Sequence, residues 1–171
     1  MGDPRRLHKK YSTPGHPWQK ERIQSELPFM GKYGLRNKKE IWRHKTQIGR
    51  YRQLARGLLA AKSEVRSQQE NLLIRKLSRL GLVPETASLD DILGLTLDDI
   101  MERRLQTLVL RKGLANTIYQ ARQMITHGHV AVDGKVIRSP SYLVTINEQS
   151  KIEYAAGSTV KKGETSKQTS K

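Results

Sequence analysis

The spacing of apolar residues changes once along this chain. From about residue 38 to residue 128 they recur every three or four positions, which is the period of an amphipathic helix. Two short runs rich in Val and Ile then follow, 130–132 and 135–137, joined by the turn-forming pair Asp133-Gly134. We therefore predict an α+β fold: a helical N-terminal part with a basic extended arm, then a small module of two helices and a β-hairpin or sheet.

Capping residues and glycines set the expected bounds of these elements. A long helix is predicted from about residue 38 to 60, opened by a capping box of Asn37 and Glu40. Three further helices are expected to end near Gly81, Gly113 and Gly128. The second of these starts near Thr96 and the third near Thr117. Later strands are expected at 142–146 and 151–154. The expected division is an arm (1–36), a helical domain (37–102), a module (103–154) and a disordered basic tail (155–171).

The charge of the chain is strongly and unevenly basic. There are 32 Lys and Arg against 16 Asp and Glu, so the formal net charge is +16. Residues 1–60 carry +11, residues 61–100 carry −2 and residues 101–171 carry +7. Two basic regions on either side of a nearly neutral middle predict a polyanionic partner that is engaged from two sides.

Composition excludes several classes of function. The chain has no cysteine, so disulfides, thiolate zinc sites and thiol nucleophiles are excluded. No apolar run approaches the roughly 18 to 20 residues that a membrane span needs, and we expect a soluble protein without a membrane partner. No metal or cofactor is predicted. Zinc at His127 and His129 lacks a third ligand, and the aspartates at 90, 91, 98 and 99 are better placed to cap helices or stabilise their dipoles than to bind metal.

The first basic region holds two groups of candidate contact residues. The expected long helix carries cations without the acids that would pair with them, so contact with phosphates is favoured over a merely solvated face. The arm interleaves cations and prolines with Trp18, and two states remain open for it: a free basic tail, or a segment that becomes ordered on its partner. For Trp42 and Tyr51, core packing is favoured over base stacking. The candidates are Arg43, Arg50, Arg52 and Arg56 on the helix, and Arg5, Arg6, Lys9 and Lys10 on the arm.

Two ordered series of motifs run through the chain. The second half contains Arg103-Arg104-Leu105-Gln106, Gln120-Ala121-Arg122-Gln123, His127-Gly128-His129-Val130 and Pro140-Ser141-Tyr142, and it closely resembles the S-four RNA-binding domain. The first half contains Gly2-Asp3-Pro4-Arg5-Arg6, Pro14-Gly15-His16-Pro17-Trp18 and Lys32-Tyr33-Gly34-Leu35-Arg36, and it resembles the archaeal and eukaryotic branch of the family of small ribosomal subunit protein four.

The resemblance implies a structural constituent of the small ribosomal subunit. Such a protein is a primary binder of small-subunit rRNA, nucleates assembly of the subunit body and contributes to translational accuracy beside ribosomal protein five. It is cytoplasmic within the ribosome, has no small-molecule substrate and is not an enzyme. Two alternatives share the RNA-binding module: an enzyme carrying it, which would need a catalytic domain that residues 1–100 do not offer, and a free-standing factor that rescues stalled ribosomal subunits.

Contacts to folded RNA are expected to rest on phosphates, 2′-hydroxyls and shape, because side chains cannot easily read its deep major groove. On the module, the predicted contact residues are Arg104, Lys112, Asn116, Thr117, Gln120, Arg122, Gln123 and His127. Thr117 is also expected to cap a helix. Ile118 stands where many family members have Arg, so one expected phosphate contact is absent and Lys112 or a neighbour is expected to supply it.

Overall fold

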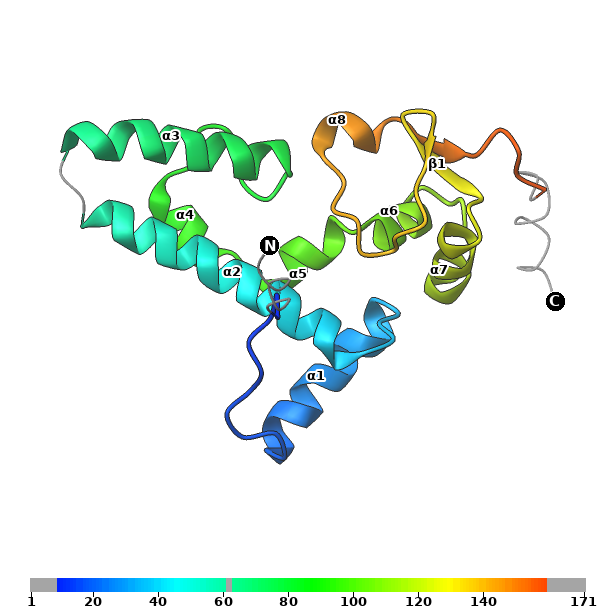
Figure 1. Ribbon diagram of the computed structural model, residues 1–171, viewed down its shortest axis with the longest axis horizontal. Helices are drawn as coiled ribbons and strands as arrows, with labels where there is room; N and C mark the ends of the chain where they lie inside the picture. Colours follow the sequence, from blue (N-terminus) through cyan, green and yellow to red (C-terminus); the bar gives the residue numbers. More distant parts are fainter. Residues whose placement is uncertain (1–8, 61–62, 160–171) are drawn as a thin grey trace, which may run out of the picture.

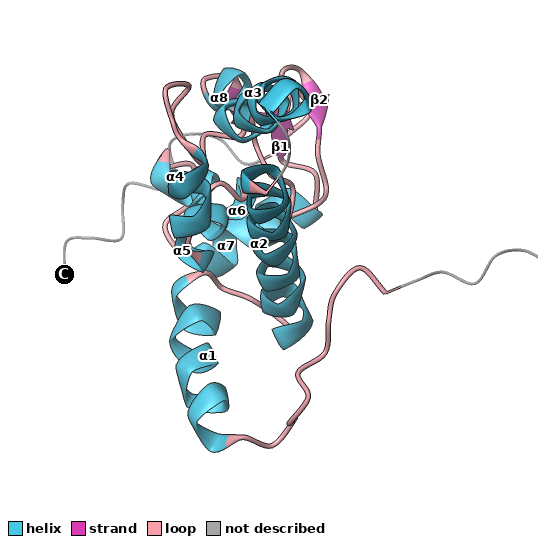
Figure 2. Cartoon of the chain, turned by 90° about the vertical axis from the view of Figure 1, so that its left-hand side faces the viewer, coloured by secondary structure: helices cyan, strands magenta, loops and turns pink. Residues whose placement is uncertain are grey.

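A computed structural model describes residues 9–60 and 63–159, in which a helical part is followed by a module with one small sheet at the other end of the molecule (Figures 1 and 2). The helices and strands are α1 (Lys20–Lys32), α2 (Lys38–Leu59), α3 (Ser63–Arg79), α4 (Leu89–Gly94), α5 (Leu97–Glu102), α6 (Leu105–Arg111), α7 (Ile118–Thr126), β1 (Val130–Val132), β2 (Lys135–Val136), α8 (Ile146–Gln149) and β3 (Ile152–Tyr154). The predicted α+β class is confirmed. Arg5 and Arg6 lie outside the described residues.

The long helix α2 is the centre of the helical part and packs against α3, α4 and α5 (Figure 1). It starts at Lys38, as predicted, and buries one stripe that includes Ile48, Tyr51 and Ala55. This stripe joins Leu77 of α3 and Ile92 of α4 in one apolar cluster. The buried position of Tyr51 agrees with the favoured core role.

Helix α1 was not expected, since residues 1–36 were predicted to be extended. It extends away from α2 on the side opposite α3 (Figures 1 and 2). Pro28 lies inside the helix and conceals it in the sequence. Glu26, only 1% exposed, fixes α1 to α2, because it accepts hydrogen bonds from Trp42 Nε1 at 3.2 Å and Lys45 Nζ at 3.4 Å.

The helix expected from Thr96 towards Gly113 is instead two helices, α5 and α6. The break falls at Arg103 and Arg104, and Arg104 has extended backbone angles (φ −71°, ψ 142°). The extended backbone lets Arg104 form an isolated β-bridge with Leu143, and Leu105 N donates to Tyr142 O at 2.8 Å. Tertiary pairing therefore overrides the continuous helical period.

The C-terminal module packs α6 and α7 against a three-stranded antiparallel sheet of order β2-β1-β3, and apolar residues of both helices and of β1 and β3 share one cluster. The predicted tight hairpin is confirmed: Val132 pairs with Lys135, and Asp133 and Gly134 both have positive φ, 52° and 74°. The strand expected at 142–146 is wrong. Only the bridge at Leu143 forms there, and Ile146 begins α8, which Thr145 caps.

The predicted tail differs at its first residues, because Ala155 is buried and its N–H donates to His129 O at 2.9 Å. Residues 160–171 lie outside the described residues. Among the helices of residues 9–60 and 63–159, none has the length and apolar character that crossing a membrane requires.

Candidate nucleic-acid interface

Helix α2 presents unpaired cations on both sides of its buried stripe. Arg43 and Arg50, two turns apart, share one side, and Arg56 lies on the other. All three side chains are exposed, and no carboxylate of residues 9–60 and 66–159 forms an ion pair with them. Arg52 differs, since its guanidinium donates to Leu95 O at 2.6 Å and is partly buried. Of the four candidates on α2, three are therefore free to reach phosphates.

Lys9 and Lys10 of the arm are also exposed. The segment that follows them is fixed on α2, because Ser12 N donates to Thr46 Oγ1 at 2.9 Å and the rings of Tyr11 and Trp42 lie 6.2 Å apart. The described part of the arm is therefore bound to the helical part of the same chain.

Helix α7 brings several predicted residues together on its outer face. Gln120, Gln123 and His127 line one shallow pocket of about 270 Å³ with Met124 and His129. The helix is capped as expected: Gln120 N donates to Thr117 Oγ1 at 3.1 Å, and Asn116 N donates to Gln120 Oε1 at 2.7 Å. The reciprocal cap holds the polar side chains of this turn in one place.

Lys112 lies at the end of α6 and fastens it to the last strand. Its Nζ donates to Ser150 O at 2.9 Å and to Ile152 O at 3.3 Å, while the residue remains exposed. The charge is not neutralised by these carbonyl groups. Lys112 can therefore contact a phosphate and hold the module together at the same time.

The prediction for Arg104 is corrected by its burial. The side chain has no exposed surface, and its guanidinium donates to Glu40 Oε2 at 2.5 Å and lies 3.3 Å from His44 Nε2. Glu40 was expected to complete a capping box, but the cap is Asn37 alone, whose side chain accepts from Lys39 N at 2.9 Å. Arg104 therefore joins the module to α2 and does not reach RNA in this conformation.

Arg122 of α7 completes this ion-pair cluster. It donates to Glu40 Oε1 at 3.1 Å and to Gly34 O at 3.4 Å, and its side chain is 24% exposed. Burial by itself would raise the pKa of Glu40, but the hydrogen bonds and charges of Arg104 and Arg122 lower it below its usual value. Arg122 thus has a structural role that the sequence did not reveal.

His44 is the titratable group enclosed in the same cluster. It is 3% exposed, and burial together with the positive charge of Arg104 lowers its pKa to about 4. A neutral ring with its proton on Nδ1 leaves Nε2 as the acceptor for the Arg104 guanidinium. The cluster at neutral pH therefore contains one carboxylate, two guanidinium groups and a neutral imidazole.

All four aspartates lie in the first turns of α4 and α5, where carboxylates stabilise the helix dipole as predicted, and two of them also cap the helices. Asp91 and Asp99 complete capping boxes with Ser88 and Thr96. Asp98 instead accepts from Lys32 Nζ and Tyr33 Oη, each at 2.7 Å, and so ties the end of α1 to α5. Among the described residues, no group of three or more His, Cys, Asp and Glu is arranged for a metal ion.

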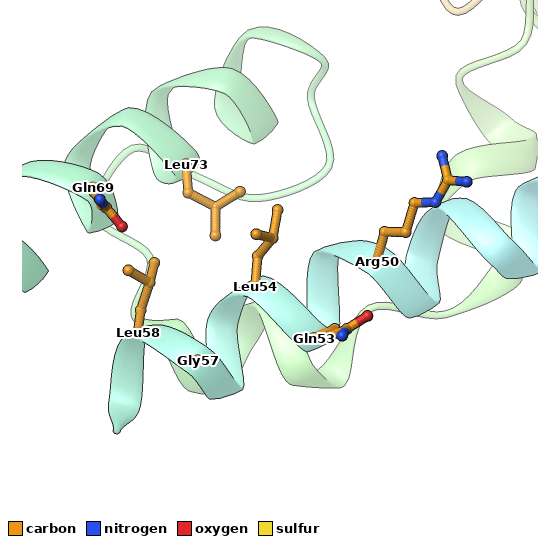
Figure 3. A pocket seen from close by; sticks show the side chains of 7 residues that line it. All are labelled: Arg50, Gln53, Leu54, Gly57, Leu58, Gln69 and Leu73. Carbon is orange, nitrogen blue, oxygen red and sulfur yellow. The ribbon is translucent and has the colours of Figure 1, made fainter. Parts of the chain in front are cut away.

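A hollow of about 650 Å³ lies between α2 and α3 (Figure 3). Leu54 and Leu58 of α2 point towards Leu73 of α3, and Gln53 and Gln69 lie at the edge. The lining contains no pair of acidic, histidine or nucleophilic side chains. It offers an apolar surface and no catalytic chemistry, and only Arg50 belongs to the predicted contact residues.

Comparisons with known proteins cover almost the whole chain. Residues 5–102 match the N-terminal domain of ribosomal protein S4/S9, and residues 103–150 match the S4 domain. The chain belongs to the uS4 family of small ribosomal subunit proteins. The small ribosomal subunit protein uS4 of Ignicoccus hospitalis is 55% identical over 155 residues, which are 91% of this chain and 93% of that protein. The same protein of Saccharolobus solfataricus is 54% identical over 162 residues, 94% of this chain and 90% of its own length.

Membership of the uS4 family confirms the resemblance found in the sequence. It also separates the chain from enzymes that carry an S4 domain, because uS4 sequence occupies residues 5–102, where such an enzyme needs its catalytic domain. The boundary between the two matched regions, 102/103, lies at the break between α5 and α6. The uS4 family is a structural, non-enzymatic component of the ribosome.

Proposed function

We propose that this chain is a structural protein of the small ribosomal subunit that binds small-subunit rRNA directly and nucleates assembly of the subunit body. Its membership of the uS4 family over both matched regions carries the proposal. By the same resemblance it lies beside ribosomal protein five and contributes to translational accuracy.

Two separated basic surfaces support direct binding. One is formed by the exposed cations of α2, with Arg43 and Arg50 on one side of its buried stripe and Arg56 on the other. The other lies on the module and combines the polar outer face of α7 with the exposed Lys112 at the end of α6. The cluster of Glu40, Arg104 and Arg122 fixes these surfaces relative to each other, so little ordering is needed when a folded RNA binds both.

Sedimentation of a cell extract at moderate salt tests the ribosomal location. The chain is expected mainly in the small-subunit peak. Finding it mainly in the free fraction, or only on stalled subunits after stress, contradicts the proposal and favours a rescue factor. Direct binding is tested separately with deproteinised small-subunit rRNA and the purified chain alone, and a requirement for another ribosomal protein would contradict a primary role.

A further inference from the structure

Trp18 is almost fully exposed on a part of the surface that neither basic surface includes. Its relative exposure is 89%, whereas Trp42 is half-buried and donates its indole N–H to Glu26. No aromatic ring or cation of residues 9–60 and 63–159 packs on the Trp18 indole. A large flat apolar face is thus left in contact with water.

The backbone that carries Trp18 is held in place by Arg22. The guanidinium donates to Pro17 O at 2.6 Å and to His16 O at 3.3 Å, and it also contacts both oxygens of Glu26 at 3.1 and 3.2 Å. Because Glu26 is buried against α2, the loop before α1 is joined through Arg22 and Glu26 to the central helix. The backbone that leads into Trp18 is therefore fixed before any partner binds.

The surroundings of Trp18 favour a polyanion. Lys20, two residues away, is an exposed cation, and Glu21 is the one acid between residues 9 and 25. The charge of Arg22 is already paired with Glu26. An aromatic ring beside an unpaired cation is the combination that stacks on an unpaired base while the cation contacts its phosphate.

We propose that Trp18 stacks on an unpaired base of small-subunit rRNA, forming a third contact beyond α2 and the S4 domain. The inference rests on the proposed function and adds to it a specific contact at the free end of α1. In Figure 1 the start of α1 points downwards, away from both α2 and the S4 domain at the upper right, so this contact would extend the RNA footprint beyond the two basic surfaces. Stacking tolerates any base, so the site selects an accessible unpaired nucleotide and not a sequence.

The first test measures the affinity of the full chain for deproteinised small-subunit rRNA. Fluorescence anisotropy of the labelled RNA reports the binding. Trp18→Ala is expected to weaken binding about 5- to 150-fold, as for loss of one base–aromatic stack, and Trp18→Phe is expected to restore most of it. Leu27→Ala is the matched control, since Leu27 is an exposed apolar side chain of α1 without a ring. Equal affinity of Trp18→Ala and the wild type would overturn the proposal.

Indole fluorescence gives a direct readout of stacking. In a Trp42→Phe background Trp18 is the sole tryptophan, and rRNA is expected to quench its emission and to protect it from acrylamide. If the Trp42→Phe variant unfolds, the wild-type chain is labelled with 5-fluorotryptophan and its ¹⁹F resonances are measured instead. The Trp18 resonance is assigned as the one that disappears in the labelled Trp18→Phe variant. An unchanged Trp18 signal at saturating rRNA, or a change only when small-subunit proteins are added, refutes base stacking. Anisotropy reports rRNA binding itself. If the wild type does not bind rRNA, the proposed function fails; if the wild type binds but the Trp18 signal does not change, only the stacking proposal fails.

Discussion

Glu40 and Arg104 are 64 residues apart in the sequence and form an ion pair whose guanidinium is completely enclosed. Glu40 lies in the first turn of α2 and Arg104 immediately before α6. The pair therefore joins the region matched by the uS4 N-terminal domain to the region matched by the S4 domain. Glu40 also accepts from Arg122, so one carboxylate pairs with two guanidinium groups of the S4 domain.

The first prediction concerns Glu40→Gln. The substitution leaves the buried charge of Arg104 without a carboxylate, and removing one partner of a buried pair costs about 3–5 kcal/mol. The free energy of unfolding, measured by chemical denaturation at pH 7, is expected to fall by roughly that amount.

Asp133→Asn is the matched control for Glu40→Gln, because it makes the same carboxylate-to-amide change in the exposed pair of Asp133 with Lys151. Asn tolerates the positive φ of this position, and a fully exposed ion pair adds little to stability because water screens it. Similar losses in the two variants would show that the enclosed pair has no special role in stability.

Elements with a clear local signal were predictable from the sequence. The start of α2, the cap of α7 and the hairpin at Asp133-Gly134 each depend on residues that are close together in the chain. Their geometry follows from capping and turn preferences that act over two to four residues.

Elements decided by distant contacts could not be predicted in this way. Arg104 looks like a surface cation of a basic motif until Glu40 is placed beside it, and the break between α5 and α6 depends on the bridge of Arg104 with Leu143. Helix α1 was missed because Pro28 argues against it locally, whereas the buried contacts of Glu26 stabilise it from α2. Of the candidate site, the exposed cations were accessible to sequence reasoning and the ion-pair cluster was not.

The second prediction concerns Gly34→Ala. Gly34 ends α1 with φ +55°, and an added Cβ would lie 2.8 Å from Gln106 Nε2 and 2.9 Å from Ile118 Cγ1. Left-handed backbone costs an alanine about 1–2 kcal/mol, and overpacking adds about 1–3 kcal/mol. A loss of roughly 2–5 kcal/mol in the free energy of unfolding is expected.

Gly113→Ala isolates the backbone contribution to that loss. Gly113 ends α6 with φ +70°, the same helix-ending hydrogen bonds and no atom within 4 Å of an added Cβ. The Gly113→Ala variant should lose only about 1–2 kcal/mol in the free energy of unfolding. If chemical denaturation gave the same loss in the free energy of unfolding for both variants, the close approach of the α1–α2 connection to the S4 domain would not contribute to stability.

The third prediction is a loss of stability on mild acidification. The pKa of His44 is about 4 in the folded chain and near 6.5 when unfolded, so the unfolded state binds the extra proton between these values. Stability should therefore fall as the pH drops below about 6.5, by about 2 kcal/mol between pH 7 and pH 5. Glu40, whose folded pKa is lowered, adds to the loss only below about pH 4.5.

Chemical denaturation of the wild type and His44→Gln between pH 5 and pH 7.5 measures this contribution. The variant is expected to lose most of the pH dependence in that window, whatever its absolute stability. An equal slope in both proteins would assign the pH dependence to other groups.

The fourth prediction concerns the exposed cations of α2. Arg43→Ala/Arg50→Ala removes two guanidinium groups that share one side of the helix and have no carboxylate partner among the described residues. Each phosphate contact contributes about 0.7–0.9 to the slope of log affinity against log salt concentration, so the slope for rRNA should fall in magnitude by roughly 1.4–1.8 when two contacts are lost. The free energy of unfolding should stay within about 0.5 kcal/mol of the wild type, because both side chains are exposed.

Comparison of Arg75→Ala with Arg50→Ala distinguishes a specific phosphate contact on α2 from a general effect of net charge on RNA affinity. Arg75 is an exposed cation of α3, in the nearly neutral middle of the chain. Both variants lose one positive charge, so a general attraction to RNA would weaken equally in each, whereas a phosphate held by α2 responds to Arg50 alone. Anisotropy titrations from 50 to 300 mM salt decide between them: an unchanged slope for Arg50→Ala, or an equal change for Arg75→Ala, would remove α2 from the RNA-binding surface.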